Sequence, residues 1–311
     1  MEFNEELLEI SSICKSLISD NDSIFYKLAS IEIETFAFQS NKDYSKAIES
    51  TKKGLAILDK HPLHPKVKRA VFYQDLIRSY LKLKDYKNAQ IYLQNVTSLF
   101  SIKSHIYFRT KGIEFSLNAA TKNYFGLLLI TTEITSSKEI NTYQVYIEEW
   151  RIRQAYVNIL IECGKIPEEL VSSNKKFRLK KFVNDIEQFS KDKRGINIAI
   201  HIAVIVHHLI RKEYHEISER LDALNQYSHR YVRKDENYRS NCFIKMLLKL
   251  PQAEYHPIRT KRYVERYWKK LQEQPYEISL REVSVEMIPF EDLWGIIIEI
   301  LNKNLKKKRN V

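Results

Sequence analysis

Glycine and proline are scarce in this chain, whose 311 residues include 6 glycines and 7 prolines. Multi-stranded sheets need many tight turns, and such turns favour these two residues because of their unusual backbone angles. A cofactor-binding α/β fold also needs a glycine-rich loop that comes close to the cofactor. Apolar residues make up 44% of the chain, which is enough to pack a core of helices. The composition therefore predicts an all-α fold.

Long apolar runs and a basic leader are also missing. The longest apolar stretch, residues 196–210, is interrupted by one asparagine and three histidines, and it is shorter than the roughly 20 residues that span a membrane. We expect this stretch to form a buried helix. The first ten residues carry four glutamates, whereas a secretory signal peptide begins with basic residues. The sequence therefore predicts neither a membrane contact nor secretion.

Cysteine is rare as well. Cys14, Cys163 and Cys242 lie far apart in the sequence and form no close pair. Secreted domains that depend on disulfides carry more cysteines at closer spacing. We therefore expect free thiols in a reducing compartment, which predicts a cytoplasmic protein.

Motifs that anchor catalysis are absent from the sequence. It contains no glycine-rich phosphate loop, no nucleophile elbow and no zinc-binding His-Glu-x-x-His motif. A minor enzyme hypothesis rests on the histidines from His201 to His215, with Glu213 as the nearby carboxylate. Metal binding requires several ligands that converge on one point, and histidines on a helix more often serve packing or face solvent. We expect no catalytic residue, no metal site and no cofactor.

The chain does contain a repeated spacing of bulky residues. Between residues 73 and 96, two successive stretches place apolar residues three and four positions apart, on one face of a helix in each stretch. These residues are Tyr73, Leu76, Ile77 and Tyr80, followed by Tyr86, Ala89, Leu93 and Val96. Such spacing predicts two antiparallel helices, and the small Ala89 lets their backbones approach closely.

This unit resembles the tetratricopeptide repeat, whose first helix carries bulky residues and whose second helix carries an early small residue. Weaker copies surround it, and their turn residues recur at intervals of 38 to 48 positions. The resemblance implies a right-handed solenoid of antiparallel helix pairs with irregular repeats of about 38–48 residues. An irregular packed helical domain is the alternative. The turn residues are Tyr44, Tyr86, Tyr124, Ile166 and Tyr214.

The C-terminal third carries a second resemblance. Residues 189–195, 239–247 and 288–294 resemble an uncharacterised family of helical-repeat proteins from Bacteroidetes bacteria. The resemblance implies a cytoplasmic bacterial protein and brings no activity with it. Within the last stretch, Pro289 suits the start of a helix and Glu291 favours the same end electrostatically. We expect this helix to close the array.

Positive charge is concentrated in the second half of the chain. Residues 1–150 contain 19 Lys and Arg against 18 Asp and Glu, whereas residues 151–311 contain 32 against 21. The second half therefore carries +11 (32 − 21) of the net charge of +12. We predict N-terminal tetratricopeptide-like repeats in residues 1–172 and a basic C-terminal helical region in residues 173–311 that continues the array. The excess charge favours an acidic partner, or it is a lysine-rich solvated surface.

A polar groove is predicted on the first helices of the pairs, because first helices line the concave face of a stacked array. Some of their side chains lie between the packing positions and are free to contact a protein or peptide segment. A solvated helix face without a ligand is the alternative. The candidates are Gln74, Arg78 and Lys82 on one ridge, Glu32 and Phe36 on the preceding first helix, and Gln154 and Asn158 further along.

A second candidate surface is basic and aromatic. Its cations are Lys175, Lys176, Lys180 and Lys181 in one stretch and Arg259, Arg262 and Arg266 in another. Cations of this kind neutralise phosphates, and neighbouring aromatic rings can stack on bases, so the pattern suits single-stranded nucleic acid. The favoured interpretation is simpler: Tyr263, Tyr267 and Trp268 form the buried stripe of an amphipathic helix.

The leading hypothesis is a non-catalytic, cytoplasmic scaffold that binds a protein or peptide segment, an acidic one being favoured by the charge. A nucleic-acid-associated protein is one alternative, and a peptide-sensing regulator is another. The sequence predicts no oligomeric state.

Overall fold

The fold is all-helical in the residues that the computed structural model describes, which are 6, 9–10, 12–14, 16–17, 23–61, 66–171, 177–187, 196–231, 238–278 and 285–309. Fourteen α-helices lie in these ranges, and no strand occurs in them. The helices pack in neighbouring pairs. The predicted all-α fold is confirmed.

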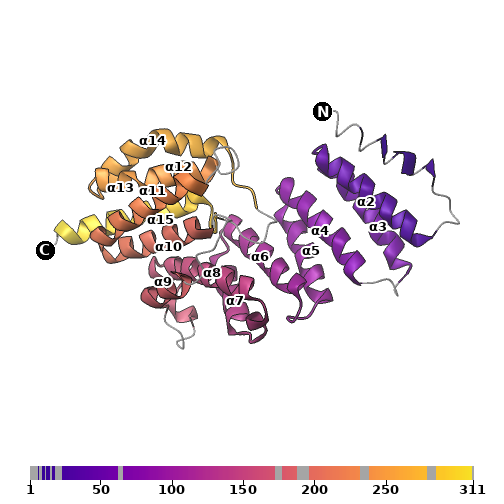
Figure 1. Ribbon diagram of the computed structural model, residues 1–311, viewed down its shortest axis with the longest axis horizontal. Coiled ribbons are helices and arrows are strands. Elements are labelled where there is room, and N and C mark those ends of the chain that lie inside the picture. The colour runs from indigo at the N-terminus through magenta and orange to yellow at the C-terminus, as the bar shows by residue number, and fades with distance from the viewer. Residues whose placement is uncertain are drawn as a thin grey trace. The chain divides into compact units, whose positions relative to one another are not determined.

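The chain divides into two compact units, Met1–Leu117 and Asn118–Val311. The predicted domains, residues 1–172 and 173–311, were based on the distribution of charge and on the repeated spacing. These boundaries stay a prediction. In unit 1, α2 packs against α3, α3 against α4, and α4 against α5 (Figure 1). The helices are α2 (Ile24–Ser40), α3 (Tyr44–Asp59), α4 (Lys66–Lys82), α5 (Tyr86–Leu99) and α6 (His105–Ala120), which crosses the division.

Unit 2 is built around α10, which packs against α8, α11 and α15, while α14 packs against α12, α13 and α15. Two short 3-10 helices, Glu139–Thr142 and Glu168–Leu170, flank α8. The helices are α7 (Tyr124–Ser136), α8 (Gln144–Glu162), α9 (Leu179–Glu187), α10 (Ile196–Arg211), α11 (Tyr214–Tyr231), α12 (Tyr238–Leu247), α13 (Lys249–Gln252), α14 (Pro257–Glu273) and α15 (Phe290–Arg309).

The turn between α4 and α5 shows how the pairs are made. Lys84 adopts a left-handed backbone with φ of 58°, and the next amide, of Asp85, donates to the Tyr80 carbonyl at 2.9 Å, which ends α4. The Asp85 side chain then accepts from the Asn88 amide at 3.1 Å and starts α5. The same left-handed lysine precedes α3, α7 and α11, at Lys42, Lys122 and Lys212.

Four of the predicted turn residues, Tyr44, Tyr86, Tyr124 and Tyr214, are the first residues of helices, as expected for the start of a second helix. The prediction at Ile166 is wrong in one respect, because the short 3-10 helix Glu168–Leu170 follows it in place of a long partner helix. The turn there is made by a glycine rather than a lysine, Gly164, with φ of 73°.

The predicted packing residues of α4 and α5 form the core of their pair. Leu76, Leu93, Val96 and Ala89 are fully buried. A similar close approach occurs between α3 and α4, where a Cβ on Gly54 would lie 2.6 Å from the Phe72 ring. Small residues therefore let these helices approach closely.

The predicted buried helix at residues 196–210 is confirmed as α10, in which Ile202, Ala203, Ile205 and Val206 are fully buried. Its apolar residues therefore serve the core of unit 2. None of the helices described by the structure is long and apolar enough to cross a membrane.

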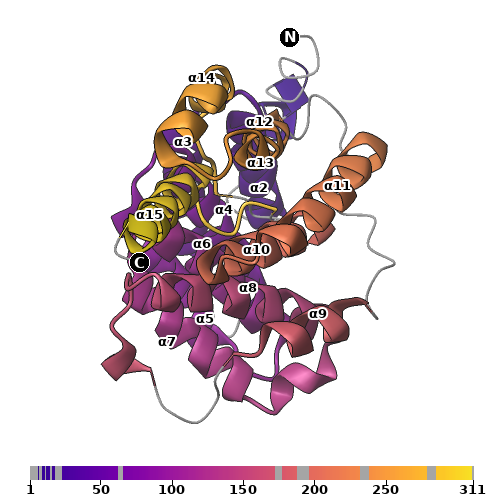
Figure 2. The same ribbon diagram turned by 90° about the vertical axis from the view of Figure 1, so that its left-hand side faces the viewer.

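Helix α15 runs alongside α10 (Figure 2) and reaches the ends of several earlier helices of unit 2. Its acidic side chains pair with lysines in turns, and an asparagine near its end donates to a backbone carbonyl of α10. The contacts are Asp292 with Lys122 at 2.7 Å, Glu299 with Lys165 at 2.9 Å, and Asn304 with the Leu209 carbonyl at 3.0 Å. These contacts fix α15 on the unit and so position the side chains that face α14.

Candidate functional site

The predicted groove residues of unit 1 lie on α2 and α4, but several of their polar groups are already paired. Arg78 donates from Nη1 to the Gln39 Oε1 at 2.9 Å and lies 3.4 Å from the Asp75 carboxylate. Glu32 accepts a hydrogen bond from Lys68 at 2.7 Å. The side chains therefore connect the two helices, and their role in ligand binding stays a prediction.

Asp75 is the most perturbed acid in this seam. Burial raises its pKa to about 6, although the nearby Arg78 guanidinium acts in the opposite direction. The Gln39 amide donates to the Asp75 carbonyl and to the Ser79 hydroxyl, each at 3.2 Å. This buried polar seam fixes the spacing of α2 and α4.

The other groove candidates differ in their surroundings. Phe36 is 52% exposed on α2, and Lys82 is exposed at the end of α4. Gln74 is half-buried on the same helix. Gln154 and Asn158 belong to α8 in unit 2, where the Asn158 amide donates to Glu162 at 2.6 Å.

The basic candidates of unit 2 lie on α9 and α14. Lys180 and Lys181 are exposed on α9, whereas Lys175 and Lys176 lie outside the described residues. Phe182, on the same helix, is buried and packs on Phe177 with ring centroids 5.4 Å apart. In α9 the aromatic residue therefore serves the core and the lysines face solvent.

In α14, the arginines interact with side chains of the same region. Arg259 pairs with Glu254 at 2.7 Å. The Arg262 guanidinium lies 5.6 Å from the Tyr263 ring centroid, and that of Arg266 lies 4.4 Å from the Tyr267 centroid. The arginines cover one side of the helix together with the tyrosine rings.

The interpretation of the α14 aromatic residues as a buried stripe is wrong. Tyr263 is 40% exposed, and Tyr267 and Trp268 are partly exposed. The buried residues of the helix are instead Pro257, Thr260, Val264 and Leu271. This neighbouring face packs against α12, so the aromatic rings lie beside the contact rather than inside it.

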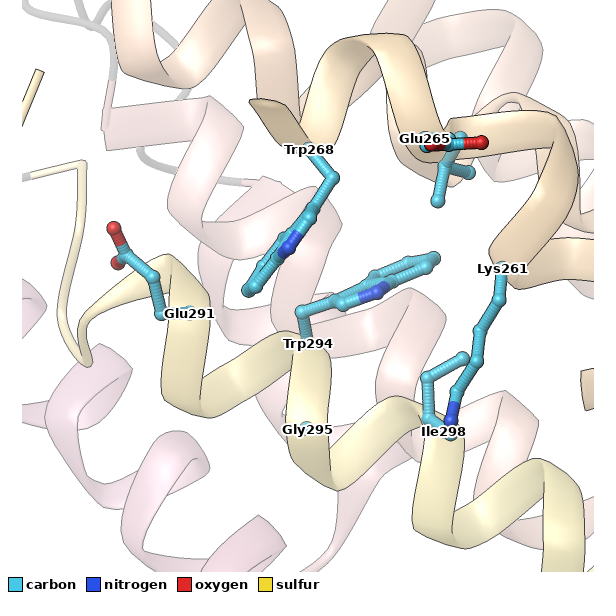
Figure 3. A pocket seen from close by; sticks show the side chains of 8 residues that line it. Lys261, Glu265, Trp268, Glu291, Trp294, Gly295 and Ile298 are labelled. Carbon is cyan, nitrogen blue, oxygen red and sulfur yellow. The ribbon is translucent and has the colours of Figure 1, made fainter. Parts of the chain in front are cut away.

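A pocket of about 510 Å³ lies between α14 and α15. Each helix contributes residues at offsets of zero, three, four and seven, which form one ridge on each helix. In Figure 3 the Trp268 and Trp294 rings both project into the space between the ridges. The lining residues are Lys261, Val264, Glu265 and Trp268 from α14 and Glu291, Trp294, Gly295 and Ile298 from α15.

The apolar part of the pocket is held rigidly. Trp294 is 5% exposed. Its ring is oriented edge-to-face with the Phe243 ring, and the two ring centroids are 6.4 Å apart. The Phe243 ring stacks in turn on the ring of Phe290, the first residue of α15, with the ring centroids 4.2 Å apart. Apart from the backbone of its own helix and its chain neighbours, no atom lies within 4 Å of the place where a Cβ on Gly295 would be. The pocket is therefore open at Gly295 and walled by a packed aromatic group.

The two lining carboxylates each pair with a cation. Glu291 pairs with Arg239 at 2.6 Å, and Glu265 pairs with Lys269 at 2.9 Å. Lys261 is exposed and forms no ion pair within the described part of the chain. Arg239 is shared with Glu286, so the Glu291 end of the pocket keeps negative charge, whereas Lys261 supplies positive charge on the other side.

Arg239 fixes the end of the pocket near Glu291. Its guanidinium also donates to Glu286 at 2.7 and 3.0 Å and to the Leu271 carbonyl at 3.1 Å. Burial lowers the pKa of Arg239, but hydrogen bonds to Glu286 and Glu291 outweigh this effect and raise the pKa above its ordinary value. The arginine remains charged and holds α12, α14 and α15 together.

The lining side chains include no cysteine, histidine or hydroxyl group. Within the described residues, no group of three His, Cys, Asp or Glu side chains is arranged to hold a metal ion. In the histidine-rich segment, His207 is fully buried and hydrogen-bonds the Ala155 carbonyl at 3.2 Å. His208 contacts Glu213 at 2.6 Å. Its histidines therefore serve local contacts.

The pocket was not predicted from the sequence, although the sequence contains one signal for it. Glu265 and Trp268 are three residues apart on α14, and Glu291 and Trp294 repeat that spacing on α15. A glutamate followed by a tryptophan on the same helix face marks both ridges. Nothing in the sequence indicates that the two ridges face one another.

The chain matches no family model, no curated protein and no solved structure. The resemblances to the tetratricopeptide repeat and to the Bacteroidetes family therefore stay predictions.

Proposed function

We propose that the protein is a non-catalytic scaffold that binds a peptide or protein segment, with the α14–α15 pocket as the place where a side chain of that segment is held. The observation that carries this proposal is the open apolar pocket between Trp268 and Trp294. Its volume of about 510 Å³ lies in the range of ordinary ligand sites. Tryptophan is also enriched among the residues that contribute most to protein binding.

The form of the pocket supports a peptide segment as ligand. Its walls are two helix ridges, and grooves between helices are a common way to bind the apolar face of another helix or an extended peptide. The pocket is open at Gly295, so an occupant can continue beyond it along α15. A segment can therefore place one side chain inside while its backbone stays outside.

We also propose how the helix pairs stack and where in the cell the protein is located. Within each unit we propose right-handed, tetratricopeptide-like stacking of the helix pairs, which the recurrent lysine turns support. We propose a cytoplasmic location, which is supported by the free thiols of Cys14, Cys163 and Cys242.

The test is selection from a displayed library of random dodecapeptides, followed by fluorescence anisotropy with synthetic copies of the enriched peptides. Gly295→Phe fills the pocket where a side chain has room, and it replaces a helical glycine with a better helix former. Gly295→Ala is the matched control, because it changes the helix without filling the pocket. We expect the intact chain and Gly295→Ala to bind the enriched peptides and Gly295→Phe to lose binding.

Failure to enrich any peptide would contradict the proposed function. Equal binding by the intact chain and Gly295→Phe would remove the pocket as the site. Circular dichroism and thermal unfolding of each variant separate loss of binding from loss of folding.

A second candidate, single-stranded nucleic-acid binding, is favoured by the exposure of Tyr263 beside Arg262 on α14. Rings and cations on one face can stack bases and neutralise phosphates. A fluorescein-labelled oligonucleotide is expected to bind with an affinity that falls steeply as salt rises, and more weakly to the Arg262→Gln, Arg266→Gln double variant. Salt-independent or undetectable binding would remove this candidate.

A further inference from the structure

The charges around the α14–α15 pocket distinguish between classes of peptide. Helix α14 carries six Lys and Arg against two Glu. The lining carboxylates, Glu265 and Glu291, are held by Lys269 and Arg239. Lys261 is the lining cation, and it is exposed. An anionic group therefore meets attraction on the Lys261 side of this pocket, beside a helix whose net charge is +4 (6 − 2).

Lys261 lies on one side of the pocket, so it attracts an anionic group to that side. In Figure 3 the Lys261 side chain extends toward Ile298, on the opposite side of the Trp294 ring from Glu291. The apolar stem of a lysine can lie along an apolar wall while its ammonium group remains in water. A segment that fills the space between the tryptophan rings therefore meets the ammonium group beyond Trp294, and it meets Arg239-bound Glu291 on the other side.

We propose that this pocket takes one large apolar side chain, aromatic or branched aliphatic, from an acidic peptide segment, and that a carboxylate within one helical turn of that side chain pairs with Lys261. This inference rests on the proposed function and names its ligand class. The apolar side chain supplies most of the affinity, because an exposed ion pair contributes little by itself. The carboxylate sets the direction of the segment and excludes basic segments.

Two tryptophan rings that line one pocket also suit a cation, since the ring faces are electron-rich. The charges argue against that occupant here. A cation between Trp268 and Trp294 would be repelled by Lys261, and the nearby carboxylates are each engaged with a cation of the chain. A basic or methylated-lysine peptide is therefore the outcome that contradicts this proposal most directly.

The experiment selects dodecapeptides with the full chain and determines the amino-acid composition of those that are enriched. We expect these peptides to combine aromatic or leucine residues with Asp or Glu and to lack Lys and Arg. In fluorescence anisotropy at low salt, Lys261→Glu is expected to weaken binding of a synthetic copy about tenfold, whereas Lys261→Arg leaves it nearly unchanged. Raising the salt concentration should reduce the difference in peptide affinity between the intact chain and the Lys261→Glu variant.

The outcomes separate this inference from the proposed function. Enrichment of neutral or basic peptides, or equal binding by the intact chain and Lys261→Glu, would overturn the ligand class while peptide binding stands. If no peptide is enriched, both proposals fail. If a labelled single-stranded oligonucleotide binds and Gly295→Phe abolishes that binding, the occupant is nucleic acid and the acidic-peptide assignment is wrong. Because Lys261 is exposed, its variants are expected to fold normally.

Discussion

Arg239 and Glu286 form a double hydrogen bond, with N···O distances of 2.7 and 3.0 Å, immediately before α15 begins. The same carboxylate accepts a hydrogen bond from the Phe290 amide at 2.6 Å, so it also caps the helix. Burial raises the pKa of Glu286, and the ion pair with Arg239 opposes that rise. The arginine thus stabilises a buried carboxylate and the start of the pocket helix together.

Replacing Arg239 with methionine is expected to lower the free energy of unfolding by about 3 kcal/mol, because Glu286 would be left buried without its cation. The loss should be smaller at pH 5 than at pH 8, since protonation removes the unpaired charge. Urea unfolding at the two pH values measures both effects. Arg259→Met is the control, because Arg259 pairs with a well-exposed glutamate, Glu254, and its loss should change stability little. Equal losses in the two variants would contradict the role of the buried pair.

Asp75 is expected to make unit 1 less stable as the pH rises. Its folded-state pKa of about 6 lies above the ordinary value of 3.8, so the folded chain binds the proton more tightly and stability falls between pH 4 and pH 6. The linked change is about 3 kcal/mol. Asp75→Asn should raise the free energy of unfolding at pH 7.5 and flatten its pH dependence over this range, as measured by urea unfolding. An unchanged pH profile in the variant would contradict the assignment.

The left-handed lysines of the turns are expected to cost stability. A side chain at φ of 58° places its Cβ close to the backbone, at a cost of about 1 kcal/mol that glycine does not incur. Lys84→Gly should therefore stabilise the chain by about 1 kcal/mol in thermal or urea unfolding. Lys53→Gly, in the middle of α3, should destabilise it by a similar amount. If both changes lowered stability, a contact of Lys84 would outweigh its backbone strain.

Two helical glycines are expected to respond in opposite ways to the same substitution. A Cβ on Gly295 meets no atom within 4 Å, whereas a Cβ on Gly54 would lie 2.6 Å from the Phe72 ring. Gly295→Ala should therefore raise the free energy of unfolding by about 0.5–1 kcal/mol through helix propensity. Gly54→Ala should lower it by about 1–2 kcal/mol because the ring must move. Urea unfolding of the two variants tests the close packing of α3 on α4.

The sequence predicted the elements whose causes are local. The start of α5 at Tyr86 follows from Asp85 as a helix cap, and the buried positions Leu76 and Leu93 follow from spacing within one helix. Both signals lie within a few residues of the structure that they predict. The turn at Ile166 lacks a capping side chain of this kind, and the expected partner helix is absent there.

The surroundings of α14 were not predictable in this way. Its periodicity allows a stripe through Tyr263 and Tyr267 or one through Thr260 and Val264, and the contact with α12 decides between them. The pocket likewise depends on two ridges that are separated by more than 20 residues of sequence. Spacing within a helix indicates which residues share a face, but the partner of that face is set by the tertiary fold.

The contacts of α15 have a consequence for the order of folding during synthesis. Lys165 and Glu299 are 134 residues apart, and Asn304 reaches back 95 residues to Leu209. In unit 1, by comparison, Gln39 and Ser79 are joined over 40 residues. Unit 1 can therefore complete its described contacts while the ribosome is still translating unit 2. Unit 2 stays open until residues 290–309 have been made, and its apolar helix α10 then needs protection from aggregation for longer.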